Sequence, residues 1–169
     1  MHLRTPGCWG SLLTASTDLT GPMGTLDHVG FVVDDVEDYL RRLSRIARVS
    51  IREIIEPHQF RTENRVLRGK PAFWMARAAF GELGGVPLEL IQPLEGESIW
   101  HEHLQKYGSG LHHLGYRVED LETEIQRMGT LGISVVQQAH NVGRSVWAYL
   151  DTVSQLGIIL ELRQIDQVG

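Results

Sequence analysis

The sequence has very little cysteine, with Cys8 as the only one among 169 residues. A single thiol forms neither an internal disulfide nor a cysteine-based zinc site, which excludes the disulfide-stabilised scaffolds of small secreted proteins. A reducing compartment suits such a chain, so we expect the protein in the cytoplasm.

Long apolar runs are absent as well. No stretch approaches the roughly 20 apolar residues that a membrane span needs. Residues 1–24 contain only the Leu12 and Leu13 pair where a signal peptide has a sustained apolar segment. The sequence therefore predicts no membrane partner, and we expect residues 1–24 to form a flexible N-terminal extension.

Positive charge is in deficit. The chain has 16 Lys and Arg against 21 Asp and Glu, a net charge of -5, which gives no basic surface for a phosphate backbone and argues against a nucleic-acid partner. What the chain does have is the composition of an ordinary globular protein, with 42% hydrophobic and 22% charged residues. Its length suits one compact unit, or two half-domains that share a core.

The two halves of the chain resemble each other. Residues 26–36 (LDHVGFVVDDV) align with residues 111–121 (LHHLGYRVEDL), and both halves end on the triplet LEL. After each first segment, apolar residues at three- and four-residue steps predict an amphipathic helix, with Asp35 and Asp120 as the N-caps. The apolar runs that follow predict three further strands in each half, so each half is β-α-β-β-β.

These elements define a first module at residues 25–94, a linker at 95–110 with a short helix over 98–107, and a second module at 111–169. The later strands are expected at 49–55, 73–80 and 88–92, and at 133–137, 145–150 and 158–163.

Four basic residues precede the aromatic strand at 73–80 and are expected in a solvated loop: Arg61, Arg65, Arg68 and Lys70. The alternative is a clamp for an anionic substrate tail.

Each half places one histidine in its first strand and one glutamate in its last: His28 and Glu89, then His113 and Glu161. Such groups are unfavourable in a core unless they are paired, because desolvating a charged or polar side chain costs several kcal/mol. Two imidazoles and two carboxylates suit the coordination shell of a divalent cation such as Co, Ni, Mn, Zn or Fe. The repeat therefore predicts one metal site that both halves share.

The neighbouring histidines have other expected roles. His112 lies on the opposite strand face from His113 by strand alternation, and it aligns with Asp27, so it is expected to be structural or exposed. On the linker helix, His101 and His103 are expected at the surface and Trp100 as an anchor. The aromatic residues of the central strands are expected in the core or in the wall of a substrate cavity; these are Phe73, Trp74, Met75, Phe80, Trp147 and Tyr149.

The segments LDHVG, LELIQPL, GLHHL and LELRQ, in this order, resemble the vicinal oxygen chelate superfamily over residues 25–165. The resemblance implies an α+β fold in which two βαβββ modules form an open, cup-shaped mixed sheet, as in glyoxalase I. It places a metal at the base of the cup, on His28, Glu89, His113 and Glu161. These four segments are most similar to those of the methylmalonyl-CoA epimerases.

This resemblance implies a homodimeric, metal-dependent isomerase or lyase that enolises a small-molecule carbonyl substrate or a coenzyme A thioester. The chain departs from the epimerase pattern in two places: residues 150–157 lack a His-Pro-Lys stretch, and residues 61–80 lack a Glu-Gln-Gly-Val stretch near the base. Proton transfer would then fall to Glu89 or Glu161. A glyoxalase I-like lyase, an extradiol-type Fe(II) dioxygenase and a non-catalytic, resistance-type binding protein remain the alternatives.

Overall fold

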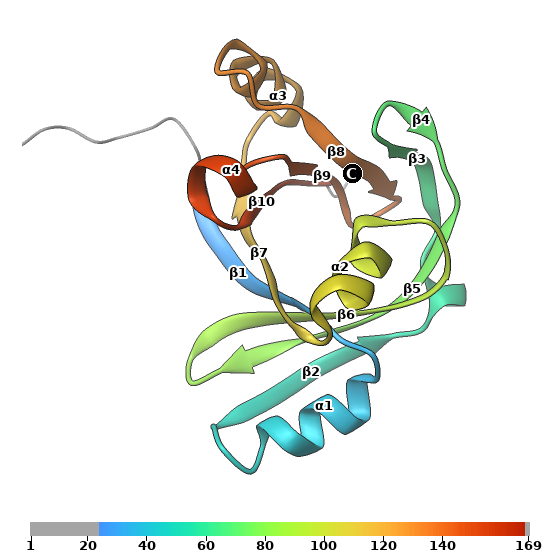
Figure 1. Ribbon diagram of the computed structural model, residues 1–169, viewed down its shortest axis with the longest axis vertical. Helices are drawn as coiled ribbons and strands as arrows, with labels where there is room; N and C mark the ends of the chain where they lie inside the picture. The colour runs from blue at the N-terminus through green and yellow to red at the C-terminus, as the bar shows by residue number, and fades with distance from the viewer. Residues whose placement is uncertain (1–23, 168–169) are drawn as a thin grey trace, which may run out of the picture.

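The computed structural model describes residues 24–167, and within them the chain forms a ten-stranded mixed sheet and four α-helices (Figure 1). In chain order the elements are β1 (Thr25–Val32), α1 (Val36–Leu43), β2 (Val49–Ile55), the 3-10 turn η1 (Pro57–Gln59), β3 (Thr62–Leu67), β4 (Lys70–Pro71), β5 (Trp74–Leu83), β6 (Val86–Gly96), α2 (Ile99–Tyr107), β7 (Gly110–Arg117), α3 (Leu121–Thr130), β8 (Val135–Asn141), β9 (Ser145–Leu150), α4 (Val153–Leu156) and β10 (Ile159–Ile165). The expected extension at residues 1–24 lies outside the described residues, apart from Gly24.

The strand order is β2-β5-β6-β1-β7-β10-β9-β8-β3-β4. The first strands of the two halves, β1 and β7, pair antiparallel at the centre, and each has the last strand of its own half beside it in parallel, β6 or β10. The sheet curls around a central space, as Figure 1 shows. The α+β, cup-shaped mixed sheet predicted from the repeat is therefore confirmed.

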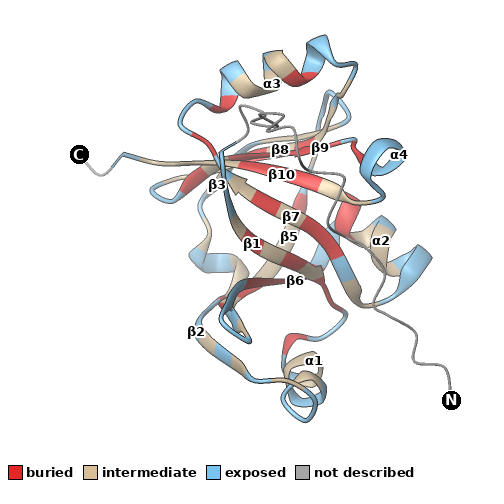
Figure 2. Cartoon of the chain, turned by 90° about the vertical axis from the view of Figure 1, so that its left-hand side faces the viewer, coloured by how far each residue is buried: buried red, intermediate tan, exposed pale blue. Residues whose placement is uncertain are grey.

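Helices α1 and α3 cover the outer face of the sheet, and strand alternation explains their positions. In each LEL triplet the two leucines point outward, so Leu88 and Leu90 pack with residues of α1, while Leu160 and Leu162 pack with residues of α3. The glutamate between each pair of leucines points into the cup. Buried residues accordingly concentrate on the central strands (Figure 2).

The helix starts follow the predicted capping. The Asp35 carboxylate accepts from the backbone N–H of Asp38 at 2.6 Å, and the Asp120 carboxylate accepts from that of Thr123 at 3.1 Å. Helix α1 ends at Leu43, with Ser44 as its C-cap. No helix among the described residues is long and apolar enough to cross a membrane.

The solvated loop expected around residues 61–70 is wrong, because these residues form β3 and β4. Strand β3 leaves the first half and pairs antiparallel with β8, the edge strand of the second half. Its partner is distant in sequence, and its charged residues carry no apolar alternation, so the local pattern does not reveal it. The repeat therefore describes eight of the ten strands, and β3 with β4 is an addition to it.

Helix α2 lies at one end of the cup, and Ser98 caps it by accepting from the backbone N–H of His101. Trp100 is 5% exposed and packs in one cluster with Trp74, Trp147 and Tyr149. The predicted anchoring role of Trp100 is thus confirmed. The cluster places four aromatic rings on the inside of the cup.

Candidate metal centre

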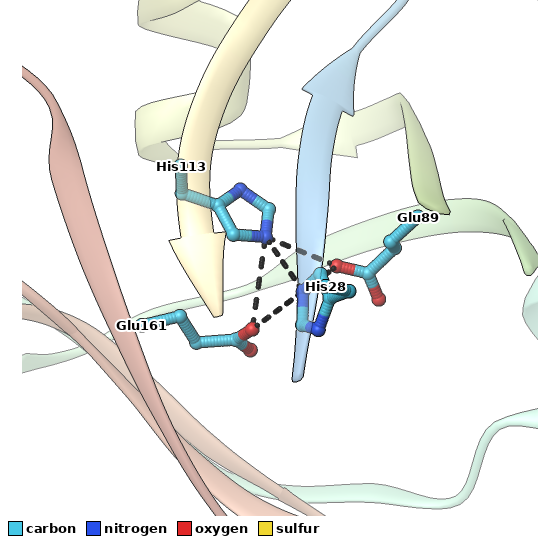
Figure 3. A group of neighbouring side chains, drawn as sticks. All are labelled: His28, Glu89, His113 and Glu161. Atoms are coloured by element: carbon cyan, nitrogen blue, oxygen red, sulfur yellow. Dashed lines mark hydrogen bonds and ion pairs between the residues drawn. The ribbon is translucent and has the colours of Figure 1, made fainter. Parts of the chain in front are cut away.

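The four polar residues predicted from the repeat come together at the centre of the sheet, on β1, β6, β7 and β10 (Figure 3). Strand register explains why. His28 lies opposite Gly115 of β7, and Glu161 lies opposite the same glycine from the other side. His113 lies opposite Gly30 of β1, which Glu89 also faces. Two adjacent rows across the sheet therefore deliver one histidine and one glutamate each.

The donor atoms of this cluster are close together. The Nε2 atoms of His28 and His113 are 3.1 Å apart. Glu89 Oε2 lies 3.3 Å from His28 Nε2 and 3.2 Å from His113 Nε2, and Glu161 Oε2 lies 3.1 Å and 3.6 Å from the same two atoms. All four donors lie within 4.8 Å of one another, and all four side chains are buried.

Glycine makes this close approach possible. A side-chain Cβ at Gly30 would overlap the imidazole of His113, and one at Gly115 would overlap that of His28. Each ring therefore lies over the glycine that it faces on the neighbouring strand. The Gly two residues after each histidine, which the repeat placed there, provides the room for the histidine of the other half.

The cluster requires a compensating positive charge. Burial opposes protonation of His28, but the Glu89 charge and the contacts with Asp27 and Glu161 raise the pKa of His28 from 6.5 to about 12. Burial also favours the neutral form of Glu89, and the facing imidazoles nevertheless lower its pKa well below the usual 4.5. A proton on His28 or a bound cation can supply the charge that the carboxylates need.

The donor set fits a divalent transition-metal ion. Donors at about 2.1 Å from such an ion lie roughly 3 Å apart when they occupy neighbouring coordination positions, which matches the contacts of 3.1 to 3.6 Å around the two histidines. In addition, the buried Oε2 of Glu161 lies beside both histidine nitrogens but makes no hydrogen bond of good geometry among the described residues. The Nε2–Nε2 contact can share only one proton, whereas a cation would satisfy both nitrogens.

The residue before each histidine contacts that histidine's second nitrogen. Asp27 Oδ2 lies 3.2 Å from His28 Nδ1, and His112 Nδ1 lies 3.0 Å from His113 Nδ1. In both strands the register shifts at this point, at Asp27 in β1 and at His112 in β7, as a β-bulge does. The two bulges occupy equivalent positions of the repeat, each one residue before the candidate ligand histidine.

His112 was expected to be either structural or exposed. It is only 4% exposed, so the second of these expectations is wrong. Helix α2 covers it, because the ring of His103 makes an edge contact with the His112 ring at 5.0 Å between centroids. His101 and His103, expected at the surface, are both partly buried. Burial and the neighbouring His113 and His103 lower the pKa of His112 well below 6.5, so it is neutral at pH 7.

Asp27 has a second role that the sequence did not reveal. It accepts from Arg117 at 2.5 Å and from Arg163 at 3.0 Å. The hydrogen bond with His28, together with the charges of Arg163 and Arg117, lowers the pKa of Asp27 from 3.8 to about 2. Arg163 follows Glu161 by two residues and so points into the cup as well. That spacing was the available signal for Arg163, whereas the inward turn of Asp27 depends on the bulge.

The cluster opens into a cavity of about 810 Å³ inside the cup. Its wall includes three of the four candidate metal ligands, His28, Glu89 and Glu161. It also includes aromatic and arginine side chains, which can contact a bound small molecule. Six aromatic residues and five arginines are among the residues that line the cavity: Phe60, Trp74, Phe80, Trp100, Trp147 and Tyr149, and Arg52, Arg65, Arg117, Arg144 and Arg163. A cavity of this size accommodates a small organic molecule.

Residues 27–149 match the glyoxalase/bleomycin resistance protein/dioxygenase superfamily. A curated relative, the uncharacterized protein YqjC of Bacillus subtilis (strain 168), is 26% identical over 142 residues, which are 83% of this chain and 91% of YqjC. Among solved structures, the hypothetical protein BH1468 from Bacillus halodurans C-125 has a TM-score of 0.63 at 24% identity, covering 86% of this chain and 96% of its own.

Two further solved structures are epimerases. Methylmalonyl-CoA epimerase from Mycobacterium tuberculosis has a TM-score of 0.63 at 21% identity, covering 88% of this chain and 92% of its own. A variant of the Streptomyces coelicolor enzyme in complex with 2-nitronate-propionyl-CoA has a TM-score of 0.64 at 17% identity, covering 86% and 99%. These identities show a shared fold. Because the superfamily match extends over residues 27–149, well over half of the chain, the protein belongs to the glyoxalase/bleomycin resistance protein/dioxygenase superfamily, the vicinal oxygen chelate proteins.

Proposed function

We propose that this protein is a metal-dependent isomerase or lyase that enolises a small carbonyl or acyl-thioester substrate, in the manner of a methylmalonyl-CoA epimerase. One observation carries the proposal: two histidines and two glutamates, all buried, converge within 4.8 Å at the base of a cavity of about 810 Å³. The epimerases among the structural neighbours, one of them in complex with a coenzyme A derivative, support the choice of substrate class.

In this proposal His28, Glu89, His113 and Glu161 hold the cation. When bound, a divalent ion supplies Lewis acidity, which polarises a substrate carbonyl and makes the adjacent C–H bond more acidic. The side chains of the cup orient the substrate and exclude water. The buried histidines, fixed by Asp27 and His112, keep the donor geometry constant through the reaction.

Glu89 and Glu161 are the proposed acid–base groups. Figure 3 shows them approaching the histidine pair from opposite sides. A carboxylate oxygen takes the proton from the substrate carbon, and the C–H electron pair moves into the enolate. Return of a proton to the other face of that carbon inverts it, which is an epimerisation, and return to a different atom gives another isomer.

The alternative chemistries use the same cup. An extradiol-type dioxygenase needs Fe(II) held by two histidines and one carboxylate, with open positions for oxygen and substrate. The second buried glutamate in this cluster favours the Lewis-acid role over that arrangement. A binding protein of the resistance type would retain the cavity and show no proton exchange.

The test is solvent exchange on methylmalonyl-CoA. Protein loaded separately with Co, Ni, Mn or Zn is incubated with this thioester in deuterated water, and mass spectrometry follows deuterium at the carbon between the two carbonyl groups. We expect exchange with at least one metal, and a loss of about 100-fold or more in Glu161→Gln. Glu119→Gln, an exposed carboxylate outside the cavity, is the matched control.

Absence of exchange with every metal, while metal content is verified by elemental analysis, contradicts the epimerase-like function. Oxygen consumption by the Fe(II) form with a catechol would instead identify a dioxygenase.

A further inference from the structure

An irregularity in β3 sends one arginine into the cup. Between the cross-strand pairs made by Glu63 and Val66, β3 has two residues, Asn64 and Arg65, where β8 has one. Asn64 has a φ of 53°, in the left-handed region that non-glycine residues seldom adopt. Bulges of this kind re-aim side chains beside binding sites, and here Arg65 becomes part of the cavity wall.

The guanidinium of Arg65 has no compensating charge among the described residues. Its Nε is buried without a hydrogen-bond partner, and no carboxylate of the described chain lies within salt-bridge distance. Burial lowers the pKa of Arg65, as expected for a cation that has lost water without gaining an anion. It stacks over the rings of Phe73 and Trp74, each 6.0 Å from its central carbon.

The other arginines of the cavity wall differ from Arg65. Arg117 and Arg163 pair with Asp27, and Arg144 pairs with Glu53 across the cup mouth at 3.0 Å. Arg52 is exposed and can keep its water. Among these arginines, Arg65 is thus the partly buried one that has no carboxylate partner among the described residues.

A continuous aromatic wall connects Arg65 with the candidate metal centre. From the ring of Trp74, successive ring centroids are 6.1 Å apart to Trp147, 5.3 Å to Tyr149 and 5.0 Å to His113. The successive ring planes meet at 48°, 64° and 76°, so the wall is apolar and presents both ring faces and ring edges, with which an aromatic ligand can make offset or edge-to-face contacts and bury area. One side of the cavity wall is therefore a row of rings from His113 to Trp74, and Arg65 lies over the Trp74 end of this row.

We propose that the substrate is a planar, aromatic carbonyl compound with a carboxylate, which places its carbonyl at the His–Glu cluster, its ring along the Trp74–Trp147–Tyr149 wall and its carboxylate on Arg65. The inference rests on the proposed function for the carbonyl end alone. The carboxylate end depends on Arg65, which lies outside the candidate metal cluster.

The test measures binding, so it does not depend on turnover. Two keto acids of different length, para-acetylbenzoate and para-acetylphenylpropanoate, are compared with their methyl esters by titration calorimetry and by quenching of tryptophan fluorescence, on metal-loaded and on metal-free protein. We expect at least one acid to bind about tenfold or more tightly than its ester, because a charge-assisted contact with a partly desolvated guanidinium is lost in the ester.

Arg65→Gln should abolish the preference for the acid and leave affinity for the ester within about twofold. Arg61→Gln makes the same charge change at an exposed residue that pairs with Glu63 beside the same strand, and it should retain the preference.

Equal affinity for acid and ester, no binding of either acid, or an acid preference that survives Arg65→Gln would each overturn the proposal. The acid-to-ester comparison uses the unmodified protein, so a folding defect in the variant cannot mimic the result. An acid preference without deuterium exchange into the acetyl group of the bound keto acid would locate the error in the proposed chemistry, and exchange into methylmalonyl-CoA without an acid preference would locate it in the substrate class.

Discussion

At the scale of single residues, the two bulge positions decide how the candidate ligands present their nitrogens. An imidazole that binds a metal through Nε2 carries its proton on Nδ1, and a partner that accepts from Nδ1 fixes this tautomer. Asp27 is such an acceptor for His28. His112 is such an acceptor for His113 when the proton of the His112 ring lies on Nε2 and leaves Nδ1 free. The lowered pKa of His112 keeps this ring neutral, so its Nδ1 can accept.

We expect Asp27→Asn and His112→Phe each to weaken Co²⁺ binding by about 10- to 100-fold, because the first replaces the charged acceptor that orients His28 by a neutral amide and the second removes the acceptor that orients His113. Affinity is measured by competition with a chelator, and the visible absorption of Co²⁺ reports the ligand geometry. Glu119→Gln, a change of an exposed carboxylate, should alter neither. Unchanged affinity and an unchanged spectrum in both variants would show that the bulges have only a structural role.

At the scale of helices and strands, much could be predicted from the repeat. The LEL triplets determine which residues face the helices and which face the cup, and β2 and β9 have the predicted bounds. Two features could not be predicted. The bulges at Asp27 and His112 interrupt the alternation on which sequence patterns depend, and β3 pairs with a strand of the other half. The position of Arg65 depends on a bulge and on the pairing of β3 with β8. Local sequence patterns reveal neither feature, so they placed Arg65 in a loop.

The glycines of the central strands offer a test at this scale. In Gly115→Ala the new methyl group would overlap the His28 ring, so we expect metal affinity to fall by about tenfold or more, and stability by about 1–3 kcal/mol as in overpacked cores. Gly110→Ala, on the same strand with open space at that position, should change stability by less than about 0.5 kcal/mol. Denaturant unfolding and chelator competition measure both. Identical behaviour of the two variants would contradict the close approach of His28 to β7.

At the scale of the whole molecule, the candidate centre joins the two halves. Its four residues come from the first and last strands of each half, within one chain, and the β1–β7 pairing runs through it. The cluster is therefore complete in a single protomer, and the homodimer expected from the resemblance stays a prediction. Strand β3 adds a second connection, since it extends the sheet of the second half.

Because the centre bridges both halves, a bound cation should stabilise the entire fold. At a free concentration of about 100 times Kd, binding adds about 2.7 kcal/mol to the free energy of unfolding, or a rise of roughly 5–10 °C in Tm for a chain of this size. Calorimetry of metal-loaded and chelator-treated protein measures the difference. Glu161→Gln, which removes one candidate ligand, should show a much smaller one.

The sign of the pH dependence follows from His28. In the metal-free protein its pKa is raised from 6.5 to about 12, so the proton's contribution to stability is fully present below about pH 6.5 and declines as the pH rises toward 12. The cation must displace this proton, so its affinity instead increases with pH. The stabilisation of loaded over metal-free protein should therefore be larger at about pH 8.5 than at about pH 7, with a larger Tm difference and a free energy of unfolding that grows by up to roughly 1.4 kcal/mol per pH unit for one displaced proton. A difference that is constant or reversed over this interval would mean that the cation binds without displacing a proton from His28, and so away from this cluster.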